Sequence, residues 1–190
     1  DTEFGPELLG YSTSTRKLVH NFGMNVDNEG GQLGAVAISP DGSTAWTWGQ
    51  YKPSVDSTAD ALYKLNLSTG APTIIPLSGT ASTGQLPTAV VVSSDGGTVY
   101  TVDNNASVEK IDTTTSEVSD IGVDSNVRGL ALSKYDATLY VAESNGEIET
   151  IDTASGDKDT DWDFAAPDNT SFASIGLTPN GNDLVVVGTD

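Results

Sequence analysis

Acidic side chains alternate in one short segment near the C-terminus, GDKDTDWDF, and one more acid follows it. Clustered carboxylate oxygens are the ligands that calcium prefers. The same spacing is typical of an outer β-strand whose acids face solvent while Trp162 and Phe164 face the core. Calcium and a solvated strand are therefore the two hypotheses for this segment. The candidate calcium ligands are Asp157, Asp159, Asp161, Asp163 and Asp168.

A second group of residues has the chemistry to hold an organic ligand. Trp48 and Tyr51 offer aromatic faces, and Lys52 and Arg128 offer cations. Aromatic faces combined with a cation or an amide donor suit glycans and peptides. The alternative is that Trp48 and Tyr51 pack between structural units. A glycan or protein ligand is therefore one expectation for these four residues.

The residues that nucleophilic catalysis requires are scarce. His20 is the only histidine and the chain has no cysteine. No G-x-S-x-G segment is present, so a Ser-His-Asp or Cys-His arrangement is not expected. No glycine-rich phosphate loop stands between a predicted strand and a predicted helix. The sequence therefore leans toward a protein that is not an enzyme.

The elements that position these residues belong to a repeat. Four segments share an apolar alternation that ends in a polar turn, and their equivalent apolar residues are separated by 54, 40 and 45 residues. Such a period is typical of repeat architectures. The equivalent residues are Ile38, Val92, Leu132 and Leu177.

Each of these segments, here called strand A, is followed by a second extended run, strand B, after a turn rich in Asp, Asn and Gly. Such residues tolerate the positive φ of tight hairpins. A third run, strand C, and a weaker fourth, strand D, recur behind the first three copies. Four strands per unit of about 40 to 45 residues is the period of β-propeller blades. We therefore predict an all-β chain that forms a small β-propeller of about four four-stranded blades.

The two ends of the chain fall at different phases of the repeat. Residues 7–22 align with strands C and D, whereas residues 174–190 align with strands A and B. We expect one domain over residues 1–190, in which these two halves complete one blade. The complete blades are expected at 35–77, 89–123 and 129–164. Closure within one chain gives a monomer, which we favour, and exchange between chains gives a head-to-tail or blade-exchanged oligomer.

The middle of the chain resembles a known repeat family. VYTVDNNASVEKIDTTTSEV and LYVAESNGEIETIDTASG, joined through VRGLALSKYD, resemble the YVTN-type β-propeller repeat of surface-layer and other secreted proteins. The resemblance implies a propeller and an extracellular or cell-surface setting. It implies no shared catalytic residues, and many members have seven repeats where this chain has about four.

The charge balance excludes one class of partner. Asp and Glu number 27 against 8 Lys and Arg, which gives a net charge of -19. Nucleic-acid binding is not expected, because phosphate contacts need basic clusters. Molar salt shortens the Debye length to roughly 3 Å and would screen the self-repulsion. A halophilic or marine source is one hypothesis, and an ordinary acidic secreted protein is the other.

Membrane insertion is not expected either, because no apolar stretch approaches the roughly 18 to 20 residues that span a bilayer. Our first hypothesis for function is a non-enzymatic extracellular or cell-surface propeller module for structure, adhesion or ligand binding. The alternative is a metal-dependent hydrolase that resembles lactonases. In that alternative, Asp103, Asn104 and Glu143, at the ends of the B strands, would surround a central ion together with Arg128.

Overall fold

The structure is a computed structural model that describes residues 7–23, 33–54, 57–77, 89–103, 107–159, 164–166 and 170–189. These residues form strands and turns without any helix, which confirms the predicted all-β class. The described part of the chain therefore contains no helix long and apolar enough to cross a membrane.

Sixteen strands lie in the described residues, and all sheets are antiparallel. The strands are β1 (Glu7–Tyr11), β2 (Leu18–Gly23), β3 (Leu33–Ile38), β4 (Thr44–Ser54), β5 (Ser57–Asn66), β6 (Pro72–Pro76), β7 (Val90–Val92), β8 (Thr98–Asp103), β9 (Ser107–Asp112), β10 (Val118–Gly122), β11 (Val127–Leu132), β12 (Thr138–Glu143), β13 (Glu147–Asp152), β14 (Phe164–Ala165), β15 (Ser171–Leu177) and β16 (Leu184–Thr189).

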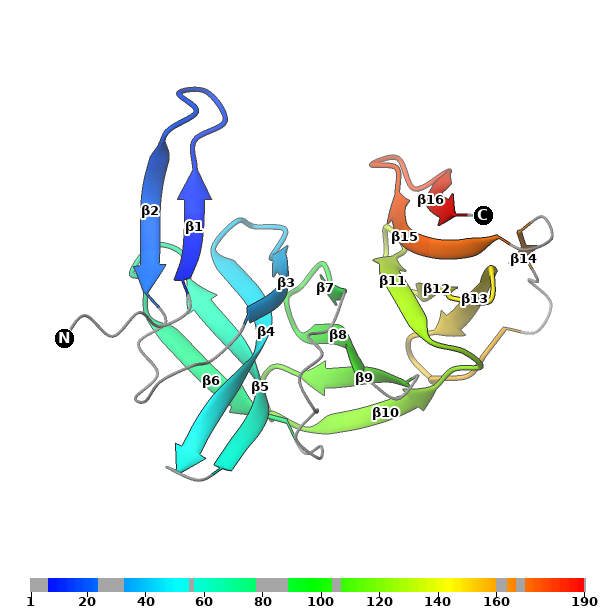
Figure 1. The fold of residues 1–190 in the computed structure, drawn as a ribbon, viewed down its shortest axis with the longest axis horizontal. Helices are drawn as coiled ribbons and strands as arrows, with labels where there is room; N and C mark the ends of the chain where they lie inside the picture. Colours follow the sequence, from blue (N-terminus) through cyan, green and yellow to red (C-terminus); the bar gives the residue numbers. More distant parts are fainter. Residues whose placement is uncertain are drawn as a thin grey trace.

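Each strand pairs with its neighbours in the chain to make five separate sheets. Strands β3 to β6 form the first sheet, β7 to β10 the second and β11 to β14 the third. Strands β1 and β2 form an N-terminal hairpin, and β15 and β16 form a C-terminal hairpin. The sheets follow one another around an open arc, with the two hairpins at its opposite ends (Figure 1). Among the described strands, β16 does not pair with β1, and the arc is not closed into a ring.

The turn between strands A and B is built in the same way in successive sheets. The Ser39 hydroxyl accepts a hydrogen bond from the Thr44 amide (3.0 Å). The Ser93 and Ser133 hydroxyls accept the equivalent hydrogen bonds from the Thr98 and Thr138 amides. A residue with positive φ follows, which explains the recurrent glycine at this place. These residues are Gly42, Gly96, Asp136 and Gly181.

The turn between strands C and D is also conserved in geometry along the chain. The Asp112 carboxylate accepts the amides of Thr114 and Thr115 at 2.8 Å each, and Asn66 and Asp152 make the equivalent bonds. This short side chain therefore replaces backbone partners within the turn. Each turn again contains one residue with positive φ. These residues are Arg16, Ser116, Gly70 and Gly156.

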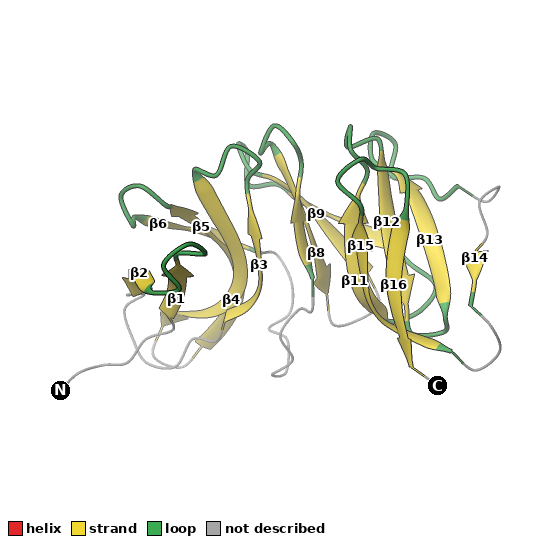
Figure 2. Ribbon diagram, turned by 90° about the horizontal axis from the view of Figure 1, so that it is seen from above, coloured by secondary structure: helices red, strands yellow, loops and turns green. Residues whose placement is uncertain are grey.

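The core lies between neighbouring sheets, which stand side by side around the arc (Figure 2). Trp46, Trp48 and Leu62 of the first sheet pack against Val90 and Val99 of the second sheet, among other buried residues. Separate clusters join the second sheet to the third and the third sheet to the C-terminal hairpin. Burial of these apolar side chains is the main force that holds one sheet against the next.

Candidate functional site

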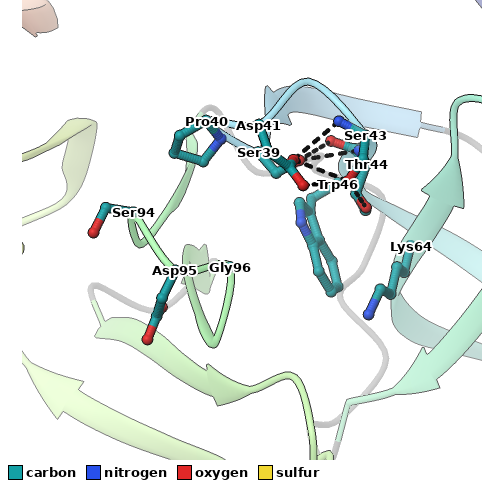
Figure 3. A pocket seen from close by; sticks show the side chains of 10 residues that line it. All are labelled: Ser39, Pro40, Asp41, Ser43, Thr44, Trp46, Lys64, Ser94, Asp95 and Gly96. Carbon is teal, nitrogen blue, oxygen red and sulfur yellow. Dashed lines mark hydrogen bonds between the residues drawn. The ribbon is translucent and has the colours of Figure 1, made fainter.

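A polar pocket opens between the first and second sheets, at the end of the sheets where the A-to-B turns lie. Its volume is about 250 Å³ (Figure 3). One side comes from the first sheet and its A-to-B turn, and the other comes from the A-to-B turn of the second sheet. The lining residues are Ser39, Pro40, Asp41, Ser43, Thr44, Trp46, Lys64, Ser94, Asp95 and Gly96.

Trp46 and Lys64 form the inner wall of the pocket. The Trp46 side chain is only 1% exposed, and its indole Nε1 has no hydrogen-bond acceptor among the described residues. Figure 3 shows this nitrogen on the side of the ring that faces the 94–96 turn. The Lys64 ammonium lies 5.0 Å from the centre of the indole ring, at the distance of a cation–π contact. The wall therefore offers one buried N–H donor and one cation.

Two carboxylates complete the pocket. The Ser39 hydroxyl donates to Asp41 Oδ1 (2.6 Å) and the Ser43 amide donates to the same oxygen (3.0 Å). The side-chain hydrogen bond from Ser39 is the main reason that the pKa of Asp41 is lowered to about 2. Asp95 has a lowered pKa for the same reason, with Ser93 as the leading donor. Both carboxylates are therefore ionised at neutral pH and held in place by their own turns.

The next junction, between the second and third sheets, is closed at the same place. The Ser94 amide donates to Asp136 Oδ2 (2.8 Å), and the Ser94 hydroxyl donates to the same carboxylate. The Lys110 ammonium donates to the Thr153 carbonyl (2.7 Å). These bonds connect an A-to-B turn and a C strand of the second sheet to turns of the third.

Two substitutions within the repeat remove one of these connections from the first junction. Pro40 occupies the position of Ser94, and proline has neither an amide N–H nor a hydroxyl to donate. Gly96 occupies the position of Asp136 and has no carboxylate to accept. Lys64 occupies the position of Lys110 and lies over Trp46. The first junction therefore lacks the Ser–Asp bridge of the second junction, as does the junction with the C-terminal hairpin, where Gly181 occupies the position of Asp136.

Of the residues predicted to hold a ligand, Trp48, Tyr51 and Arg128 are not among those that line this pocket. Trp48 is buried in the junction between the first and second sheets, and Tyr51 is half-buried against the first sheet. Arg128 is exposed on β11. The Lys52 side chain lies outside the described residues. The aromatic members of this group are therefore in packing contacts, and a ligand role for them stays a prediction.

Glu143 is buried at the end of β12, where its carboxylate accepts hydrogen bonds from a neighbouring loop. Its Oε1 accepts the amides of Asp124 (3.0 Å) and Ser125 (3.1 Å). Burial raises the pKa of Glu143, although these two donors act in the opposite direction. The Asp103 side chain and Asn104, proposed to share an ion with it, lie outside the described residues. The described environment of Glu143 is that of a carboxylate engaged by backbone amides.

The predicted calcium segment is described only in part. Asp157 and Asp159 are exposed, whereas Asp161, Asp163 and Asp168 lie outside the described residues. Lys158, between the first two, forms ion pairs with Asp124 (2.8 Å) and Glu149 (2.5 Å). Within the described ranges no three His, Cys, Asp or Glu side chains gather as a metal site would require. Calcium at this segment stays a prediction.

The sequence contained a signal for the pocket that motif searching did not use. Once the repeat is aligned, Pro40 of the first A-to-B turn stands where the second turn has Ser94, and Gly96 of the second turn stands where the third turn has Asp136. Pro40 and Gly96 are common turn residues and carry no functional motif. Their meaning depends on which side chains face each other across a junction, and a single strand pattern does not specify that.

Comparison with known proteins supports the fold class. No family model matches this chain, and no curated protein matches it. Among solved structures, it is similar to Kuenenia stuttgartiensis hydrazine synthase, with a TM-score of 0.60, 24% identity, and coverage of 80% of this chain and 40% of that one. It is also similar to U3-55K, with a TM-score of 0.62, 14% identity, and coverage of 80% and 44%.

The chain thus spans less than half the length of the solved structures it matches. Both neighbours are of the β-propeller type, so the chain has a β-propeller-like all-β fold.

Proposed function

We propose that this chain is a non-enzymatic β-propeller module that binds a glycan in the pocket between its first and second sheets, at the cell surface or outside the cell. Each four-stranded sheet is then one blade, and the two hairpins are the halves of a further blade. The observation that carries the proposal is the open first junction, which has a buried, unpartnered indole N–H where the second junction is bridged.

The pocket offers donors and acceptors side by side. The Trp46 Nε1–H and the Lys64 ammonium can only donate, whereas the ionised Asp41 and Asp95 carboxylates can only accept. A ligand that satisfies all of them needs groups that both accept and donate. The hydroxyl groups of a sugar have this property, while a simple anion would be repelled by the two carboxylates.

The size of the pocket limits how much of a glycan it takes. A volume of about 250 Å³ lies below the roughly 300 to 1,000 Å³ of pockets for drug-sized ligands. A single sugar ring, presented at the end of a chain, is therefore the expected occupant. Trp46 is too buried to offer its ring face for stacking, and its Nε1 is buried as well, so Lys64, Asp41 and Asp95 make the first contacts with the sugar.

The setting outside the cell rests on different support. The central repeats resemble the YVTN-type repeat of surface-layer and secreted proteins, and the net charge of -19 suits a saline environment. A halophilic or marine source is part of the proposal. Acid-rich surfaces also repel other acidic polymers, so neutral glycans are the expected class of ligand.

The experiment is a glycan array followed by calorimetric titration of the strongest neutral glycan. The decisive variant is the double substitution Pro40→Ser with Gly96→Asp, which builds the Ser94–Asp136 bridge into the first junction. We expect binding to fall at least tenfold. Gly96 has a φ of 70° and Asp136 one of 59°, so the aspartate fits the backbone that the turn already has.

The control opens the second junction by Asp136→Gly alone, which removes the Ser94–Asp136 bridge without changing a residue that lines the pocket, and it should leave binding unchanged. Lys64→Met should weaken binding, whereas Lys110→Met, at the equivalent position of the second sheet, should not. Equal affinity in the bridged variant and the parent would place the ligand elsewhere. An array without any neutral glycan bound would refute the ligand class.

A further inference from the structure

The interior junctions between sheets show which positions a neighbouring sheet must cover. In the first junction, Trp46 and Trp48 of β4 pack against Val90 of β7. In the second junction, Tyr100 and Val102 of β8 pack against Leu130 of β11. All of these side chains are buried. Alternate residues of a B strand therefore face the A strand of the following sheet.

The equivalent positions at the two ends of the arc are exposed. On β16, Val185 and Val187 align with Trp46 and Trp48 and are 59% and 55% exposed. On β3, Val36 aligns with Val90 and is 49% exposed, and Ile38, two residues on, is 50% exposed. Val185 and Val187 therefore correspond to the B-strand side of an interior junction, and Val36 and Ile38 correspond to its A-strand side. The two sides lie at opposite ends of the arc.

The N-terminal hairpin also exposes an apolar residue whose equivalents in the complete sheets are buried. Tyr11 of β1 aligns with Leu65, Ile111 and Ile151, which are fully buried, yet Tyr11 is 62% exposed. A groove of about 450 Å³ lies between this hairpin and β3. Its apolar lining includes Leu8, Leu9, Tyr11, Val19, Val36 and Ile38. In the complete sheets, strand B pairs with the corresponding C strand, and strand A lies on the other side of strand B.

We propose that a second copy of this chain inserts its C-terminal hairpin beside β1, so that β15 and β16 of one copy and β1 and β2 of the other form one four-stranded sheet. Val185 and Val187 of the inserted hairpin then cover Val36 and Ile38. The interface repeats the interior junctions and does not depend on the glycan proposal. Two copies joined at both ends contribute six complete sheets and two composite ones.

The chain's own hairpin is poorly placed to fill the groove. It lies at the opposite end of the arc from β1 (Figure 1), where it packs against β11. Packing there is close, because a Cβ at Gly129 would lie 3.0 Å from the Ile175 backbone nitrogen. Moving it to β1 would require a tighter curvature at every junction. A second copy fills the groove with the curvature unchanged.

Charge also favours contact between copies at these surfaces. Residues 7–23 contain one acid, Glu7, and two bases, Arg16 and Lys17. Residues 170–189 contain a single ionisable side chain, Asp183. The two surfaces are therefore close to neutral in a chain with a net charge of -19, and their approach meets little of the repulsion that other faces would produce.

The interior sheets also predict the register of the new pairing. Leu139 faces Ile151 in the third sheet, and Val99 faces Ile111 in the second. By alignment, Leu184 should face Tyr11, and Val186 should face Leu9. Directly opposed residues in antiparallel strands have Cα atoms about 4.5 to 5.5 Å apart, which is within reach of a disulfide.

The test uses this register, because the chain has no cysteine of its own. Leu9→Cys and Val186→Cys are made as single variants and together. After mixing and mild oxidation, the two single variants should give a covalent heterodimer on a non-reducing gel. The double variant should form covalent dimers. The control pair Leu9→Cys and Val185→Cys should not link, because a shift of one residue turns the second side chain to the other face.

Sedimentation velocity of the parent protein supplies an independent measurement. We expect a dimer that dissociates when Val187→Lys is introduced, whereas Tyr135→Lys, on an exposed turn away from the ends, should leave the dimer intact. Circular dichroism establishes that each variant is folded. A double-cysteine variant that links within one chain, or a parent protein that is monomeric at every concentration and does not cross-link, would overturn the proposal.

Discussion

Gly146 and Gly156 provide a paired test of how closely the C-terminal hairpin packs against the third sheet. Both residues have a positive φ, 84° and 80° respectively. A Cβ added at Gly146 would lie 2.2 Å from the Thr170 carbonyl oxygen, just before β15, whereas a Cβ at Gly156 would meet nothing within 4 Å. Alanine at Gly156 therefore carries the backbone cost alone, and alanine at Gly146 adds a steric cost.

The magnitudes follow from these distances. A left-handed backbone costs a residue with a side chain about 1 to 2 kcal/mol, and restriction of the unfolded chain returns about 0.4 to 1 kcal/mol. Gly156→Ala should therefore destabilise by about 1 kcal/mol, in keeping with Ser116 at the equivalent turn position with a φ of 63°. At Gly146 the Thr170 carbonyl must move by about 1 Å, and overpacking of this kind typically adds about 1 to 3 kcal/mol.

The assay is urea denaturation of the parent and both variants, followed by tryptophan fluorescence. We expect Gly146→Ala to lose about 2 to 4 kcal/mol of unfolding free energy, clearly more than Gly156→Ala. Equal losses in the two variants would refute the close approach of Gly146 to Thr170. The docking of the C-terminal hairpin on the third sheet would then be in error.

Three other predictions concern charge. Glu143→Ala should cost about 2 to 4 kcal/mol, because the amides of residues 124 and 125 lose their shared acceptor, whereas Glu143→Gln should stay within about 1 kcal/mol of the parent. The pKa of Glu143 is raised from 4.5 by burial, so the stability that Glu143 contributes is present below pH 4.5 and is lost as the pH rises through the folded pKa. Glu143→Gln should abolish that loss in urea titrations over this pH range. A pH profile that is the same in the variant and the parent would count against the buried carboxylate. Backbone hydrogen bonds lower the pKa of Asp112 and of Asp152, so the stability that these carboxylates contribute is present above pH 3.8 and is lost as the pH falls. Asp112→Asn should therefore make the protein less sensitive to acid. The turn should be kept, because Asn66 makes the same hydrogen bonds in the first sheet. The melting temperature should rise substantially between low and molar KCl, and a flat response would contradict self-repulsion as the dominant effect of 27 acidic residues.

The sequence predicted the class and order of strands well because the same strand pattern recurs in each copy of the repeat. The first two A-to-B turns contain Ser, Asp and Gly in the same order, and the Ser–Asp hydrogen bond of the first recurs in the second. The C-to-D turns recur in the same way around Asn66, Asp112 and Asp152. Local rules of this kind act within a few residues, so a strand pattern contains them in full.

Contacts between sheets were harder to predict. Glu143 stands at the end of a strand, like a residue of a central opening, yet it is buried under the loop that contains Asp124 and Ser125. The pocket at Trp46 depends on Pro40, which has no N–H or hydroxyl to donate, and on Gly96, which has no carboxylate to accept. Both outcomes follow from how neighbouring sheets meet, and strand periodicity does not encode that geometry.

The measurement that tests the central claim most directly is an amide and indole NMR titration of the ¹⁵N-labelled protein with the neutral glycan selected on the array. Trp46→Phe and Trp48→Phe identify the two indole N–H signals of the first sheet. We predict that the Trp46 indole signal shifts as its N–H gains an acceptor, together with amides of the 39–44 and 94–96 turns, while the Trp48 indole signal stays in place. A saturating glycan that leaves the Trp46 indole signal and both turns unchanged would contradict a ligand site in the first junction.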